Sequence, residues 1–213
     1  SQGKSLYYEH PSAELRGLRS LLSLKRRLKK QEQGYRLRIR NHLLAQYFPE
    51  MDRDYERLGA EGLSIVRGCV AASEMAQLDK APFIERVTSR RIPMKRRRRL
   101  EEVWEKSAES IGCEGVPGLD HEAKVLVEGL KQIREMLKQT DRTIEALCKP
   151  FPGYACLLTI PGFGPDISAK VLGAIGDPER FQNGKQVLKL SGFDLSADRS
   201  GKDSDRAIPE ISK

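Results

Sequence analysis

Two long stretches of helical apolar periodicity constrain the fold of this chain most. In the first, from Ser12 to about Phe48, apolar residues recur at steps of three, four and seven, and Pro49 ends the pattern. The second runs from Leu119 to Leu147 with the same spacing, and Val125 is predicted on its apolar face. Pairing in a coiled coil is the usual reason for helices of such length. The sequence therefore predicts a long antiparallel helical arm.

Shorter amphipathic segments lie between the two long ones, and no segment shows the alternation typical of a strand. The predicted fold class is therefore all-α. A loop rich in Gly and Pro is expected over residues 112–118. The shorter helices are predicted over residues 60–78, 82–91, 94–111 and 183–191. The buried side of the third would be formed by Leu100, Val103, Trp104 and Ile111.

The turn sequence Pro150-Phe151-Pro152-Gly153 predicts a domain boundary. Residues 1–150 would form the coiled-coil arm with short inserted helices. Residues 151–213 would form a small helical domain.

That small domain contains a glycine hairpin between Leu158 and Ala169, with Ile160 in its apolar, packing face. Gly162 and Gly164 tolerate backbone angles that other residues resist, and Pro165 suits the first turn of a helix. The free N–H groups of the second helix would then face the turn, where they could donate hydrogen bonds to a phosphate oxygen. The pattern predicts a helix-hairpin-helix that holds a nucleic-acid backbone. The alternative is a tight helical hairpin that only packs within the protein. Asp166 also opposes the interpretation, because its carboxylate would repel a phosphate.

The basic composition supports an anionic partner. The chain has a net charge of +8 and a pI near 9.4. Basic residues cluster between Lys25 and Lys30 and again from Lys95 to Arg99. The second run opposes the dipole of its predicted helix, which favours a role in binding a partner. Such runs also form solvated faces, and composition leaves both interpretations open.

The sequence predicts a cytoplasmic protein without a membrane segment or a metal site. No segment reaches the length of a membrane helix, and no targeting signal is visible. The cysteines and histidines are scattered, without paired metal-ligand spacing, and the cysteines are interpreted as reduced thiols. These residues are Cys69, Cys113, Cys148, Cys156, His10, His42 and His121.

A series of short motifs carries a resemblance to a known family. In chain order they are Leu158 to Pro165, Ala169, Ile175-Gly176-Asp177, Arg180-Phe181, Lys185-Gln186, Leu190-Ser191-Gly192, Ser200-Gly201-Lys202 and Ile211-Ser212-Lys213. Their order and spacing resemble the C-terminal domain of the "one-ten" insertion-sequence transposases, whose relatives are the Piv DNA invertases. The segment from Glu14 to Glu50 is similar to the coiled-coil region that precedes this domain.

The resemblance implies DNA recombination. In this family a RuvC-like domain binds a divalent metal such as Mg²⁺, a coiled coil supports homo-oligomers, and some members use a structured guide RNA. No part of this chain resembles the RuvC-like domain, and the chain stops before the family's Gly-Asn and Leu-Arg positions. The expectation is a truncated transposase that is inactive by itself.

The resemblance also identifies a candidate nucleophile. Ser200 matches the family's catalytic serine, with Arg199, Lys202 and Arg206 as candidate phosphate-binding cations. Ser204 and Ser212 are alternatives. Without the resemblance, Ser200 would be interpreted as part of a polar loop.

The hairpin supplies further candidate nucleic-acid contacts. Gly162 and Gly164 match the family's hairpin positions, and Lys170 and Lys185 lie on the following helices. Both lysines can equally be solvated surface residues. Two other functions stay open at this stage: a non-catalytic module for branched or structured nucleic acid, and a coiled-coil assembler.

Overall fold

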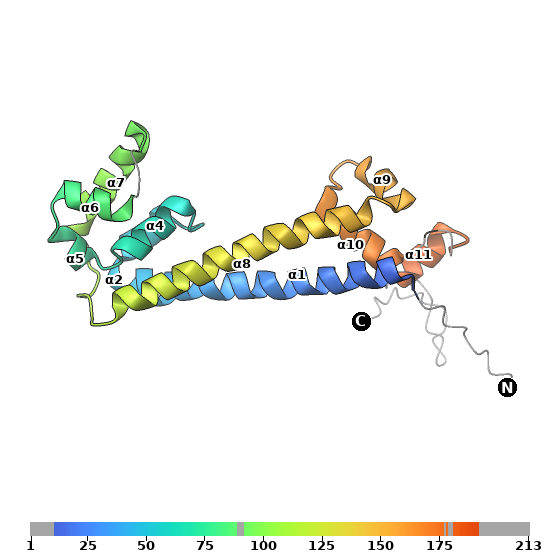
Figure 1. Cartoon of the computed structure of the whole chain (residues 1–213), viewed down its shortest axis with the longest axis horizontal. Coiled ribbons are helices and arrows are strands. Elements are labelled where there is room, and N and C mark those ends of the chain that lie inside the picture. Colours follow the sequence, from blue (N-terminus) through green and yellow to red (C-terminus); the bar gives the residue numbers. More distant parts are fainter. Residues whose placement is uncertain (1–10, 89–91, 177, 179–180, 192–213) are drawn as a thin grey trace, which may run out of the picture. The chain divides into compact units, whose positions relative to one another are not determined.

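The computed structural model describes residues 11–88, 92–176, 178 and 181–191, and every regular element in these ranges is a helix (Figure 1). The predicted all-α class is confirmed. The elements are α1 (Ala13–Arg38), the π-helix η1 (Ile39–Leu44), α2 (Ala45–Tyr47), α3 (Pro49–Asp54), α4 (Ala60–Gly68), α5 (Ala72–Ala76), α6 (Lys80–Val87), α7 (Met94–Ser107), α8 (Leu119–Cys148), α9 (Pro152–Leu158), α10 (Pro165–Ile175) and α11 (Gly184–Leu190).

The ends of the first helical stretch follow from local chemistry. The N–H of Leu15 donates to Ser12 Oγ at 3.2 Å, so that Ser12 caps the start of α1. The helical path continues through η1 and α2 to Tyr47. Pro49 interrupts it as predicted, and the same proline then begins α3, where its missing N–H is not needed.

The chain divides into two compact units. Unit 1 comprises Ser1–Lys25 and Thr140–Lys213, and unit 2 comprises Arg26–Gln139. Each unit has its own hydrophobic cluster. The predicted division into residues 1–150 and 151–213 stays a prediction.

In unit 1, the start of α1 packs closely on α10. A Cβ on Gly173 would lie 2.6 Å from Leu22 Cδ1, so only a glycine fits there without a shift. Arg19 Nε donates to the carbonyl of Gly173 at 2.8 Å. The buried cluster consists of Leu15, Leu18, Ile144, Cys148, Tyr154, Ala169 and Leu172.

In unit 2, the remainder of α1 runs antiparallel to α8. The Glu32 carboxylate binds Arg134 at 3.0 Å, and further along α1 the Tyr35 ring lies against Gly129, which comes earlier on α8. Val125, predicted on the buried face of α8, is 53% exposed. Neighbouring helical residues point about 100° apart, and Leu126 occupies the buried position instead.

The short helices of unit 2 are tied together by Glu61, at the start of α4. Its carboxylate accepts two hydrogen bonds from Arg99 of α7, at 2.9 and 2.8 Å, and one from the Tyr55 hydroxyl at 2.9 Å. Arg96 pairs with the same carboxylate at 3.2 Å. Burial favours the neutral acid, but these donors outweigh it and lower the pKa of Glu61.

The helix predicted over residues 94–111 ends at Ser107. As a result Ile111, predicted on its buried side, lies beyond the helix and is 86% exposed. Leu100 and Val103 are buried as expected. Trp104 is half-buried, and its indole N–H donates to the carbonyl of Leu78 at 2.9 Å.

Candidate nucleic-acid interface

An exposed turn joins α9 to α10 within unit 1 (Figure 1). Gly162 has a φ of 86°, a left-handed conformation that favours glycine, and a Cβ there would meet open space. Gly164 has extended angles, with φ −80° and ψ 176°, which any residue can adopt. Pro165 begins α10 as predicted. The turn is thus on the surface, and only Gly162 requires a glycine for its conformation.

The start of α10 offers unused backbone donors. The amides of Gly164, Asp166 and Ile167 form no hydrogen bond with any residue in the described ranges. The N-terminus of a helix concentrates partial positive charge, and such free amides suit an anionic oxygen. This geometry is compatible with the predicted phosphate contact.

Asp166, the residue expected to repel a phosphate, is held by two lysines. Its carboxylate binds Lys25 of α1 and Lys170 of α10, the latter at 2.6 Å. Partial burial favours the neutral acid, but the hydrogen bonds from Lys170 and Lys25 outweigh it and lower the pKa of Asp166 to about 2. The carboxylate is therefore ionised at neutral pH, with its charge compensated locally.

The position of Lys25 differs from the sequence-based expectation. It was predicted in an exposed basic block, yet its side chain is only 8% exposed and binds both Asp141 of α8 and Asp166 of α10. This lysine therefore joins three helices of unit 1. It is a structural residue rather than a free surface cation.

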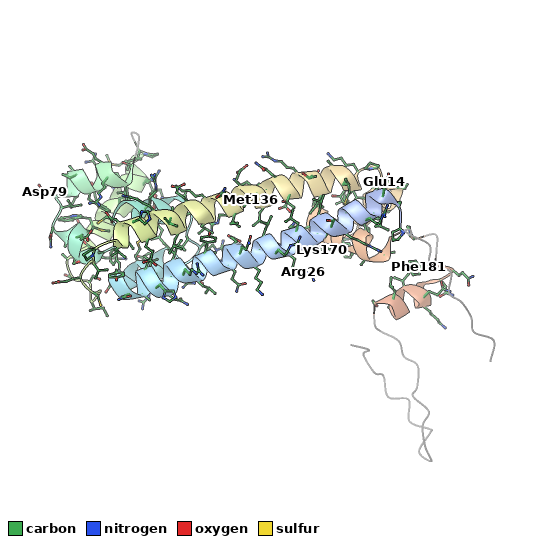
Figure 2. All side chains as sticks on the ribbon, turned by 60° about the horizontal axis from the view of Figure 1, so that its bottom comes forward. Glu14, Arg26, Asp79, Met136, Lys170 and Phe181 are labelled. Carbon is green, nitrogen blue, oxygen red and sulfur yellow. The ribbon has the colours of Figure 1, made fainter. Side chains whose placement is uncertain are left out.

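Of the other candidate residues, the two lysines lie in the described part of the chain and the remaining ones lie outside it. Lys170, labelled in Figure 2, is exposed on α10, but its ammonium is paired with Asp166. Lys185 is exposed on α11. Their contacts with phosphate stay predictions. Residues outside the described ranges are Ser200, Arg199, Lys202, Arg206, Ser204 and Ser212.

The surface around the turn is more apolar than the sequence suggested. Ile160 was predicted in the buried apolar face but is 43% exposed. Leu158 and Ile167 are also exposed, at 42% and 43%. Backbone amides and apolar side chains thus make up much of this surface, with Lys170 beside them already paired.

The described ranges contain no cluster of three or more His, Cys, Asp or Glu side chains that could hold a metal ion. Within them all four cysteines are free thiols, and burial raises the pKa of Cys69 to about 11. Such a thiol is a poor nucleophile near neutral pH. Of the helices described, none is long and apolar enough to span a membrane.

Comparison with known proteins places the C-terminal part of the chain in a family. Residues 154–212, which begin within α9 and include the exposed turn, match the model described as "Transposase IS116/IS110/IS902 family". The match supports the resemblance of this part of the chain to the one-ten insertion-sequence transposases, which the order of the short motifs predicts. No curated protein and no solved structure matches the chain.

Proposed function

We propose that residues 151–213 hold DNA for strand cleavage and rejoining. The observation that carries this proposal is the coincidence of the family match with an exposed turn that offers unused amides. In this proposal the turn and its two helices act as a helix-hairpin-helix. Gly162, Gly164, Lys170 and Lys185 contact the sugar-phosphate backbone.

The proposed nucleophile is Ser200. Its Oγ forms a bond to a backbone phosphorus while the bond from that phosphorus to one strand oxygen breaks. The serine proton leaves to a base, and the departing oxygen takes up a proton. A hydroxyl of another strand then attacks the serine–phosphate and releases Ser200. Arg199, Lys202 and Arg206 would stabilise the charge that develops on the phosphoryl oxygens.

Other parts of the proposal rest on the family resemblance. By the family resemblance, a divalent metal such as Mg²⁺ would be bound by the RuvC-like domain. Self-association through the long helices, a structured guide RNA and a cytoplasmic location also belong to the proposal.

The nucleophile is tested in a complete protein that contains this chain and a RuvC-like domain. With element-end DNA and Mg²⁺, the unmodified protein should form a covalent protein–DNA product. Ser200→Ala should abolish that product and recombination while it leaves DNA binding intact. Ser204→Ala and Ser212→Ala serve as matched controls that keep both.

Two results would change the proposal. Recombination that survives Ser200→Ala, Ser204→Ala and Ser212→Ala alike would favour a non-catalytic module for branched or structured nucleic acid. A covalent product formed by the 213-residue chain alone would contradict the expectation that this chain is inactive by itself.

A further inference from the structure

A row of uncompensated cations follows α1, and four of them, Arg26, Arg27, Lys30 and Arg38, share one face of the helix. Between Arg26 and Arg38, no basic side chain forms an ion pair or hydrogen bond with any residue that the structure describes. All are exposed except the half-buried Arg36, whose Nε is shielded from solvent and has no partner. The uncompensated residues are Arg26, Arg27, Lys29, Lys30, Arg36 and Arg38.

The row lies between two cations that are fully engaged. Lys25 binds two aspartates, and Arg40 forms a two-pronged pair with Asp52 at 2.6 and 2.8 Å. The only acidic residue within the row, Glu32, is paired with Arg134 of α8. The stretch therefore keeps its positive charge without local neutralisation.

The second basic run of the chain is different. On α7, Arg96 and Arg99 pair with Glu61, and Arg97 pairs with Glu101 at 3.1 Å. Arg96 and Arg99 join α7 to α4, whereas the pair of Arg97 lies within α7. Lys95 and Arg98 form no ion pair with any residue that the structure describes. In unit 2, uncompensated positive charge is thus concentrated on α1 rather than on α7.

This arrangement costs α1 helical stability. Arg26 and Lys30 are four residues apart, and like charges at that spacing repel each other along a helix. Gly34 lies in the same stretch, is exposed, and has no atom within 4 Å of the position of a Cβ. A glycine inside a helix is unfavourable, and packing gives no reason for this one. No contact described within unit 2 offsets the repulsion between these cations or the unfavourable glycine.

We infer that this face of α1, which belongs to unit 2, binds the backbone of duplex DNA, whereas the turn belongs to unit 1. Twelve residues of helix separate Arg26 from Arg38, which is about 18 Å at 1.5 Å per residue. One strand of a duplex advances about 3.4 Å along the duplex axis per phosphate, so about 18 Å corresponds to about five phosphate steps, of which a straight helix faces a part because the strand winds around the axis. Because Gly34 has no side chain, a DNA strand could come close to the backbone of α1 at this position. Arg26 is labelled on α1 in Figure 2.

A membrane surface is a poor alternative partner. A helix that lies on a membrane inserts a free apolar face between the headgroups. Here Leu28 and Ile39 are buried and Tyr35 packs against Gly129, so Leu37, at 46%, is the large apolar side chain of this stretch that is exposed.

The test neutralises part of the row in the 213-residue chain. Arg26→Gln/Arg27→Gln/Lys30→Gln is compared with Lys95→Gln/Arg98→Gln/Lys124→Gln, a control that removes the same charge from exposed positions elsewhere in unit 2. Fluorescence anisotropy measures the Kd for a short DNA duplex between about 50 and 200 mM salt. The α1 variant should lower the slope of log affinity against log salt by about 2 to 3, and raise the Kd at least about tenfold. The control should change the Kd by less than about threefold.

Folding and charge are separated by two further measurements. Because the substitutions remove repulsion, the Tm of the α1 variant should equal or exceed that of the original chain. Arg26→Lys/Arg27→Lys keeps the charge and should keep the Kd within about twofold. Equal losses in the α1 variant and the control, or a loss confined to duplex RNA, would overturn the inference. A catalytic failure of Ser200 would leave it standing, since this assay involves no strand cleavage.

Discussion

Replacing Lys25 by Met is the sharpest test of how the turn is supported. The substitution keeps most of the apolar stem but removes the ammonium that binds Asp141 and Asp166. The substitution thus removes the ion pair between α1 and α10, and Asp166 retains its ion pair with Lys170.

The expected cost follows from exposure. A hydrogen bond to a charged group contributes about 1.5 to 3 kcal/mol, and Lys25 makes two. The side chains of Asp141 and Asp166 are 51% and 40% exposed, so water can solvate both carboxylates once the lysine is gone. We therefore expect a loss of about 1 to 2 kcal/mol rather than the full sum. Lys170→Met is the matched control, because its pair with Asp166 is an exposed i,i+4 contact worth about 0.3 to 0.5 kcal/mol.

Urea unfolding followed by circular dichroism gives the free energies, and hydrogen exchange shows where protection is lost. Lys25→Met should raise exchange in α10, while the fluorescence of Trp104, which lies in unit 2, should respond less. If the two lysine variants lose the same stability within about 0.3 kcal/mol, the role assigned to Lys25 is wrong.

Acid unfolding provides a second measurement of the same contacts. The pKa of Asp166 is lowered from 3.8 to about 2, so its stabilising contribution is present above about pH 3.8 and is lost as pH falls through 2. In Lys25→Met this acid dependence should be shallower, because the folded-state pKa returns toward its ordinary value. An unchanged acid profile would show that Lys25 does not set the charge state of Asp166.

Three further changes test other contacts. Glu61→Gln should destabilise unit 2 by about 2 to 3 kcal/mol in urea unfolding monitored by Trp104 fluorescence, because it weakens the contacts to Arg99, Arg96 and Tyr55; Glu101→Gln, which removes one i,i+4 pair, should cost at most about 0.5 kcal/mol. Gly162→Ala should lower stability by about 1 kcal/mol or more because of its positive φ, whereas Gly164→Ala should cost less than about 0.5 kcal/mol; equal losses would contradict the turn geometry. Gly34→Ala should raise stability by about 0.5 to 1 kcal/mol, and a lower Tm would mean that the methyl meets a neighbour.

The long helices could be predicted because periodicity is a local signal. The stretch predicted from Leu119 to Leu147 corresponds to α8, which ends one residue later. The prediction of burial was wrong for residues beyond the end of a helix or at the edge of its apolar face. Ile111 fits the helical spacing of α7, but the helix stops before it, and Val125 lies at the edge of an apolar face that Leu126 fills.

The partners of charged residues were beyond local prediction. Lys25 follows Leu18 by seven positions and precedes Leu28 by three, so its place on the buried stripe could have been recognised. Its partners could not, because Asp166 is 141 positions away in the sequence. For the same reason, the sequence offered no acidic partners by which to distinguish the two basic runs as candidate binding surfaces. In the structure, arginines of α7 pair with Glu61, whereas the exposed cations of α1 pair with no described acidic residue.

This difference separates two contributions to the proposed binding of DNA. The turn offers neutral amides, apolar side chains and a lysine already paired with Asp166, which suits positioning of a phosphate better than long-range attraction. The free cations of α1 suit attraction, since each phosphate neutralised by a cation adds to the salt dependence. Substitutions in the turn should therefore weaken DNA binding with little change in the salt slope, whereas substitutions on α1 should reduce that slope. If turn variants flatten the slope as strongly as α1 variants, this separation of positioning from attraction fails.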